Sequence, residues 1–205
     1  MEWSAWEPTY RAILADFGYD AKADESARDE LDAMISDRPW AELPDLHDQT
    51  AVILGGGPYQ DVPPGILLVA DPRRVPPRRP DVIVTDLDGD AALQLALNAE
   101  GVPLVAHAHG DNRRALAAHV PHMKGPVRGS TQAAPTGRVQ NWGGFTDGDR
   151  ACCLAVALGA TRLTLAGFDF DEPAPKPGRD PAVKARKLAW ARRIIDGLGV
   201  PVEFV

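Results

Sequence analysis

The chain has 205 residues, of which 44% are hydrophobic and 25% are charged, and its formal net charge is −7. This composition is ordinary for a soluble globular protein, and the acidic balance argues against a general nucleic-acid or membrane-surface binder. No apolar run approaches the roughly 20 residues that cross a bilayer, and the N-terminus lacks the basic and apolar regions of a signal peptide. The adjacent Cys152 and Cys153 fit reduced core residues, so we expect a cytoplasmic protein.

Residues 1–46 are predicted to form a small helical N-terminal extension. Apolar side chains recur there at three- and four-residue spacings, which is typical of an amphipathic helix, and Gly18 is a plausible end for it. Ser26 with Asp29 resembles a capping box at the start of a second helix. Pro39 to Pro44 then reads as a linker.

Two short apolar runs, 50–54 and 66–70, predict the first two strands of the main domain. A glycine-rich turn that includes Gly56 and Gly57 follows the first run, and its backbone could approach a phosphate closely. The turn matches neither the dinucleotide fingerprint nor the P-loop. The basic, proline-rich loop from Pro72 to Pro80 is either a solvated face or an anion-binding lip.

A strand–helix–strand unit spans residues 81–112. The runs 82–84 and 102–106 predict parallel strands joined by a helix near 92–99, so polar residues that follow both strands should emerge at one edge of the sheet. Asp86, Asp88 and Asp111 are therefore expected to converge there, and carboxylates in this number suit Mg²⁺. The alternative is that these residues only form turns and helix caps.

The C-terminal half is predicted to contain a helix over 113–123, a long irregular segment over 124–150 and a buried helix over 151–159 started by Asp147 or Asp149. A strand over 162–166, a proline-rich loop over 173–181, a helix over 183–198 and a final strand over 200–205 complete it. The fold class is thus α/β, with a Rossmann-like, open and mostly parallel sheet flanked by helices. The catalytic domain is assigned to residues 47–205.

Six motifs occur in one order: Gly-Gly-Gly-Pro at 55–58, Val-Thr-Asp-Leu-Asp-Gly at 84–89, His-Ala-His-Gly-Asp-Asn at 107–112, Thr-Gln at 131–132, the segment 141–150, and Gly-Phe-Asp-Phe at 167–170. Together they resemble the archaeal 6-hydroxymethyl-7,8-dihydropterin pyrophosphokinase family, which is distantly similar to thiamin pyrophosphokinase. The chain departs from the family pattern at Tyr59 and at Asp71-Pro72-Arg73, and more mildly at Trp142 and Phe168.

The resemblance implies a transferase that uses Mg²⁺. Its partners would be ATP and a pterin alcohol, and its products the pterin diphosphate and AMP, in tetrahydrofolate or tetrahydromethanopterin biosynthesis. Assembly into a homo-oligomer is left open. Asp86, Asp88 and Asp111 would be catalytic and hold the metal. Substrate and nucleotide contacts would come from Gly56, Gly57, Asn112, Thr131, Gln132, Asn141, Gly143, Gly144, Asp147, Asp149, Arg150 and Lys187.

The side chains fit this chemistry, because phosphoryl transfer depends on positioning and charge neutralisation. Arg150, Lys184 and Lys187 are candidates to neutralise phosphates, although the two lysines also fit a solvated helix face. Trp142 and Phe145 could stack on a pterin or belong to the core. His107 and His109 fit a role in supporting the metal ligands.

Two other functions remain open. A phosphohydrolase of the haloacid dehalogenase type would use Asp86 as its nucleophile and Asp88 as its acid, but two strands precede this loop and His107 to Asn112 would have no role. A non-catalytic nucleotide-binding module would bind ATP without turnover.

Overall fold

The structure is a computed structural model that describes residues 2–170 and 180–205. Its described strands form one eight-stranded sheet in the order β6-β5-β4-β3-β2-β1-β7-β8, and every pairing is parallel. Most of the predicted loop 173–181 lies outside the described residues. The strands are β1 Thr50–Leu54, β2 Ile66–Ala70, β3 Val82–Thr85, β4 Leu104–Ala108, β5 Val127–Thr131, β6 Val139–Gln140, β7 Arg162–Ala166 and β8 Val202–Phe204.

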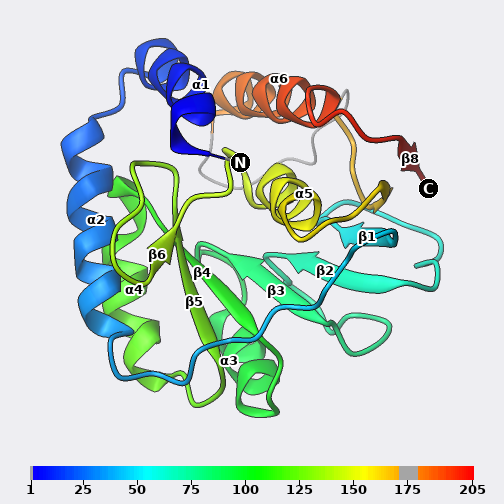
Figure 1. Ribbon diagram of the computed structural model, residues 1–205, viewed down its shortest axis with the longest axis horizontal. Coiled ribbons are helices and arrows are strands. Elements are labelled where there is room, and N and C mark those ends of the chain that lie inside the picture. The colour runs from blue at the N-terminus through cyan, green and yellow to red at the C-terminus, as the bar shows by residue number, and fades with distance from the viewer. Residues whose placement is uncertain (1, 171–179) are drawn as a thin grey trace.

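Helices cover both faces of this sheet, which confirms the predicted α/β class (Figure 1). The helices are α1 Trp3–Phe17, α2 Ala21–Met34, α3 Ala91–Ala99, α4 Arg113–His119, α5 Asp147–Ala157 and α6 Pro181–Asp196, with short 3₁₀ turns η1 Gly110–Asn112 and η2 Val120–His122. Helices α5 and α6 pack on the face formed by alternate residues such as Ile53, Leu68 and Val84. Helices α2 and α4 pack on the opposite face against Ile83 and Leu104. Burial of both faces explains why the strands read as continuous apolar runs.

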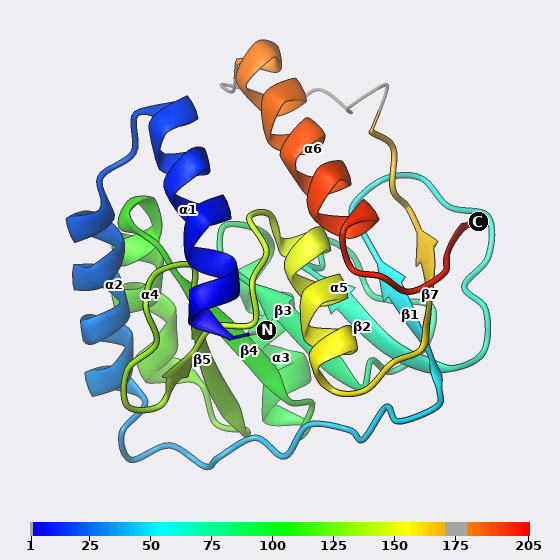
Figure 2. The same cartoon turned by 45° about the horizontal axis from the view of Figure 1, so that its top comes forward.

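The two N-terminal helices lie next to each other but pack against different parts of the molecule (Figure 2). Trp6, Tyr10 and Ile13 of α1 pack with Phe145, Cys153 and Ile194, which lie on or beside α5 and α6. Gly18 ends α1, as predicted, and has a left-handed conformation. The capping box predicted at Ser26 is wrong, because α2 begins at Ala21 with Asp20 as its N-cap and Ser26 lies inside the helix.

The segment 124–150 was predicted as irregular but contains strands β5 and β6. Its composition hides them, because Arg128 and Gly129 interrupt the apolar pattern. The guanidinium of Arg128 lies 3.8 Å from the centre of the Trp40 ring. Gly129 is needed for close packing, since a Cβ there would lie 2.9 Å from Cδ1 of Ile35. A strand can thus form from residues that give no clear alternation.

Other elements differ from the prediction mainly at their ends. Helix α5 begins at Asp147 and is capped by Thr146, and Asp149 completes the capping box. Strand β4 runs two residues later than expected, over Leu104–Ala108. No helix in the described part of the chain is long and apolar enough to span a membrane.

Candidate active site

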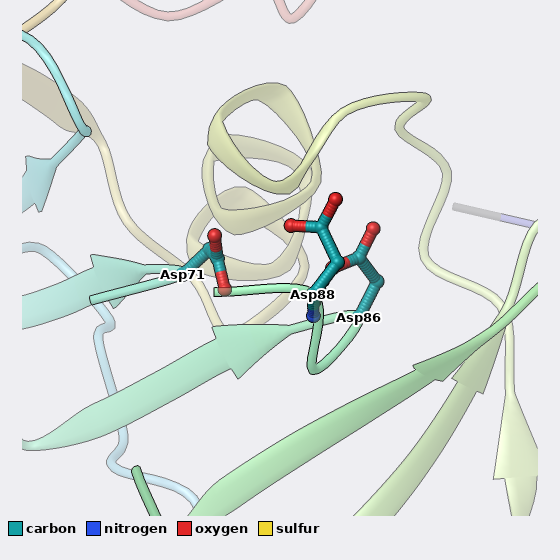
Figure 3. Close-up of side chains that lie close together, drawn as sticks. All are labelled: Asp71, Asp86 and Asp88. Atoms are coloured by element: carbon teal, nitrogen blue, oxygen red, sulfur yellow. Dashed lines mark hydrogen bonds between the residues drawn. The ribbon is translucent and has the colours of Figure 1, made fainter. Parts of the chain in front are cut away.

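Three carboxylates lie together at the carboxyl edge of the sheet. Asp71 follows β2, and Asp86 and Asp88 follow β3 (Figure 3). One oxygen from each lies within 4.8 Å of the others, which is close enough for all three to share one cation. The parallel pairing of β2 with β3 brings the two strand ends to the same edge.

The backbone around this cluster is strained. Asp71 and Leu87 have φ values of 43° and 64°, a left-handed region that side chains other than glycine rarely adopt. Gly89 lies so close to Asp71 that a Cβ there would be 2.4 Å from its Oδ1. Such strain persists only where the surroundings hold it in place, and it is common at functional sites.

The pKa values of two carboxyl groups in the cluster, those of Asp71 and Asp86, are shifted in opposite directions. Burial raises the pKa of the Asp71 carboxyl, and the neighbouring charge of Asp86 raises it further. Burial also acts on Asp86, but the hydrogen bond and charge of His109, helped by the backbone N–H of Asp88, outweigh it and lower the pKa of Asp86 to about 2. Asp86 is therefore the carboxylate that stays ionised, while Asp71 resists a further negative charge.

Asn112 and His109 fix the position of Asp86. Nδ2 of Asn112 donates to the backbone carbonyls of Asp86 (2.8 Å) and His107 (2.7 Å), so it ties the ends of β3 and β4 together. Its Oδ1 accepts the N–H of His109, and Nε2 of His109 lies 3.4 Å from Oδ2 of Asp86. The Asn112 side chain thus positions the loop that carries Asp86.

Helix α5 contributes two ionisable residues, Asp147 and Arg150, next to the cluster. Burial and the negative charge of Asp86 raise the pKa of Asp147 well above its usual value, and its Oδ1 is buried without a hydrogen-bond partner among the described residues. Arg150 is 3% exposed and donates to the carbonyls of Gly144 and Phe145. The positive charge of Arg150 partly offsets the rise in the pKa of Asp147, so the two side chains interact electrostatically.

Buried His107 faces the same environment from β4. Its Nδ1 lies 3.0 Å from Oγ of Ser130, while its Nε2 has no partner in the described part of the structure. Burial, together with the charge of Arg150, lowers the pKa of His107 well below its usual value. His107 is therefore a neutral imidazole.

Several predicted contact residues are engaged by the protein itself. Gln132 donates to Asp24, the Thr131 hydroxyl accepts the N–H of Ala133, and Asn141 donates to the carbonyl of Ala133. Asp149 accepts the N–H groups of Phe145 and Thr146. These side chains shape the loops around the site.

Gly143 and Gly144 turn the chain tightly before α5. Their φ values are 87° and 95°. A Cβ on Gly144 would lie 2.4 Å from Cα of Arg150, so glycine is required for this approach.

A cavity of about 200 Å³ opens beside the carboxylates. It lies between the glycine turn after β1 and the basic loop after β2. Gly57 donates to the carbonyl of Gly167 (2.9 Å), which fixes the turn against the end of β7, whereas the position of a Cβ on Gly56 is open space. The lining includes Gly55, Gly56, Tyr59, Asp71, Arg73 and Arg74.

Two predicted residues lie elsewhere. Asp111 is exposed in η1 and does not belong to the group of carboxylates that could share a cation. It lines a separate hollow with Glu30 and Arg113. The ammonium group of Lys187 lies 5.4 Å from the centre of the Phe145 ring and 5.6 Å from that of Tyr19. Phe145 itself is 8% exposed and packs in the core beside α1.

Asp71 is the residue of this site that the sequence motifs left out. Its signal in the sequence was its position directly after the second predicted strand, at the carboxyl edge that also carries Asp86 and Asp88.

Comparisons with known proteins agree with the motifs. A family model described as 6-hydroxymethylpterin diphosphokinase MptE-like matches residues 79–174. A protein named 6-hydroxymethyl-7,8-dihydropterin pyrophosphokinase from Methanothermobacter thermautotrophicus is 37% identical over 97% of this chain and 95% of its own length. Proteins of the same name from Pyrococcus furiosus and Methanocaldococcus jannaschii are 34% and 31% identical, over 97% and 99% of this chain and 94% and 98% of their own lengths.

Proposed function

Because the chain belongs to the 6-hydroxymethyl-7,8-dihydropterin pyrophosphokinase family, we propose that it transfers diphosphate from ATP to the hydroxymethyl group of this pterin. The products would be the pterin diphosphate and AMP, and the pterin diphosphate would serve tetrahydrofolate or tetrahydromethanopterin biosynthesis. The observation that carries the proposal is the carboxylate cluster at the sheet edge, flanked by a glycine turn and by buried Arg150.

The donor set fits a hard divalent cation such as Mg²⁺. Asp71, Asp86 and Asp88 offer oxygens within 4.8 Å of one another, and oxygen ligands are what Mg²⁺ takes. We propose these three residues as its holders. When bound, the cation would neutralise charge on the transferring phosphates.

The chain's own residues would position the reactants. Asp86, ionised near neutral pH, would orient the pterin hydroxyl or accept its proton. Arg150 would place a buried positive charge near the transferring group, since Arg pairs well with phosphate oxygens. The backbone of Gly56 and Gly57 would approach the nucleotide phosphates from the end of β1. Neutral His107 would present a hydrogen-bonding nitrogen to the same space.

The positions of the site residues along the chain support the same proposal. The carboxylates, the glycine turn and Arg150 all lie within residues 47–205, which we propose as the catalytic domain. Residues 1–46 would brace it, because buried Asp24 of α2 accepts hydrogen bonds from Gly110 and Gln132, next to the strand ends that carry the site.

A turnover assay tests this function against the phosphohydrolase alternative. The protein is incubated with ATP and Mg²⁺, with and without 6-hydroxymethyl-7,8-dihydropterin, and AMP and inorganic phosphate are measured. AMP that forms only with the pterin supports the pyrophosphokinase. Phosphate release that is independent of the pterin favours the hydrolase.

A further inference from the structure

Arg73 is bonded to two members of the carboxylate cluster. Its Nη2 lies 3.0 Å from Oδ2 of Asp71 and 3.3 Å from Oδ1 of Asp88, and its Nε lies 3.2 Å from the same Asp71 oxygen. The guanidinium therefore bridges a carboxylate from the end of β2 and one from the loop after β3. These are two of the three side chains whose geometry suits a shared cation.

We propose that Arg73 is an exchangeable counter-cation of this site. It neutralises Asp71 and Asp88 in the resting protein, and it turns to the nucleotide phosphates when a divalent cation binds the carboxylates. The inference rests on the proposed function, since it takes the phosphates to be those of the bound nucleotide.

Arg73 and a divalent cation would compete for the same carboxylate oxygens. A cation that takes one oxygen from each of the three carboxylates needs lone pairs that Arg73 now shares, and it adds a second positive charge within a few ångströms of the guanidinium. The two cations repel each other, so binding of one weakens binding of the other. The Arg73 side chain is 46% exposed, whereas that of Asp71 is 7% exposed, so the arginine is the partner with room to move.

The cavity beside the cluster gives Arg73 a second place to bind. Its lining includes Arg73 and Asp71 together with Gly55, Gly56 and Tyr59, so a guanidinium leaving the carboxylates already faces the glycine turn. Nucleotide phosphates at that turn would lie within its reach, and the planar fork of Arg matches phosphate oxygens. Displaced by the divalent cation, Arg73 would therefore gain a partner in place of those it loses.

Arg74 is a matched control on the same loop. Its guanidinium lies 4.5 Å from the centre of the Tyr59 ring, and its Nη2 donates to the carbonyl of Gly57 over 3.2 Å. Arg74 lines the same cavity. Within the part of the chain that the structure describes, it forms no ion pair with Asp71, Asp86 or Asp88, whereas Arg73 pairs with Asp71 and Asp88. Loss of charge on the loop is thus the same in Arg73→Gln and Arg74→Gln, and only the first removes the bridge.

Calorimetric titration of the nucleotide-free protein with Mn²⁺ tests the exchange without any turnover. Arg73→Gln is expected to tighten Mn²⁺ binding about fivefold or more, Arg73→Lys to fall between it and wild type, and Arg74→Gln to stay within about twofold of wild type. In the presence of Mn²⁺, Arg73→Gln should weaken binding of a non-hydrolysable ATP analogue by about tenfold. Thermal unfolding of each variant checks that it is folded.

Unchanged or weaker Mn²⁺ binding by folded Arg73→Gln would overturn the proposal. So would tighter Mn²⁺ binding with unchanged affinity for the ATP analogue, because Arg73 would then have no second partner. Failure of the proposed function is a separate result. If the affinities for Mn²⁺ and the ATP analogue change as expected but wild type makes no pterin diphosphate, the role of Arg73 as a counter-cation is supported and the assignment of the pterin substrate is wrong.

Discussion

The side-chain amide of Asn112 donates a hydrogen bond to the backbone carbonyl of Asp86 over a distance of 2.8 Å. The two residues are 26 positions apart in the sequence: Asp86 directly follows β3, and Asn112 ends the 3₁₀ turn η1 that follows β4. Because the same amide also holds the carbonyl of His107, one side chain fixes the relative position of the two loops.

Replacement of Asn112 by Ala should damage the site through position alone. The change leaves two carbonyls and the N–H of His109 without their partner, which should lower the free energy of unfolding by roughly 1–3 kcal/mol. Displacement of Asp86 should lower kcat by about 10²-fold. Chemical denaturation and steady-state kinetics measure the two effects. Normal kcat in a destabilised variant would show that Asn112 does not position Asp86.

Asp147 should cost the protein stability at neutral pH. Its folded-state pKa is raised well above 3.8, its usual value, by burial and by the charge of Asp86. The folded state therefore releases this proton less readily than the unfolded state does, and the penalty grows as pH rises above 3.8. Asp147→Asn should raise the free energy of unfolding by roughly 1–3 kcal/mol at pH 8 in EDTA, and by less at pH 5.

Asp149→Asn serves as the control for Asp147, because it makes the same change two residues later in α5. Asp149 is also buried, but its carboxylate accepts N–H groups from Phe145 and Thr146, so its replacement should destabilise the protein at both pH values. A stability gain for Asp147→Asn that is equal at pH 5 and pH 8 would contradict the electrostatic explanation.

Alanine substitutions at Gly56 and Gly57 should distinguish an effect on ATP binding from an effect on stability. A Cβ at Gly57 would lie 2.7 Å from the carbonyl oxygen of Gly167, so Gly57→Ala should destabilise the protein by about 1–3 kcal/mol. A Cβ at Gly56 meets nothing within 4 Å, so Gly56→Ala should leave stability within about 0.5 kcal/mol. If phosphates approach this turn, Gly56→Ala should still weaken ATP binding about tenfold. Unchanged ATP affinity in both variants would remove the turn from the nucleotide site.

Asp24 should be the main polar anchor of the N-terminal helices. Its carboxylate accepts hydrogen bonds from Tyr10, Gln132 and the N–H of Gly110, each between 2.8 and 2.9 Å. Asp24→Ala leaves three donors without this acceptor and should lower the free energy of unfolding by roughly 3–5 kcal/mol. Tyr10→Phe removes one donor and should cost roughly 1 kcal/mol. Urea denaturation compares them, and equal losses would argue against a shared anchor.

The sequence predicted the sheet well where its signals were local. Apolar runs such as 50–54 and 66–70 match β1 and β2, because strands buried on both faces carry few polar residues. Strand β5 escaped prediction because Arg128 and Gly129 are set by tertiary contacts with Trp40 and Ile35.

The candidate site was predictable in part for the same reason. The strand-end argument predicted that Asp86, Asp88 and Asp111 converge, but the group that the structure forms contains Asp71 in place of Asp111. The position of Asp71 depends on a left-handed backbone and on the close approach of Gly89. Those are properties of the folded chain. A sequence motif likewise cannot show that Asn112 and Gln132 form hydrogen bonds with other groups of the protein.

The most direct test of the central claim follows the β-phosphorus of ATP. The protein is incubated with Mg²⁺, 6-hydroxymethyl-7,8-dihydropterin and ATP labelled at the β-phosphorus, and the products of wild type and Asp86→Asn are separated. Pyrophosphoryl transfer predicts that wild type moves the label into the pterin product with one AMP formed for each, and that Asp86→Asn does not. Label that stays in ADP, or phosphate released without the pterin, would contradict the proposed function.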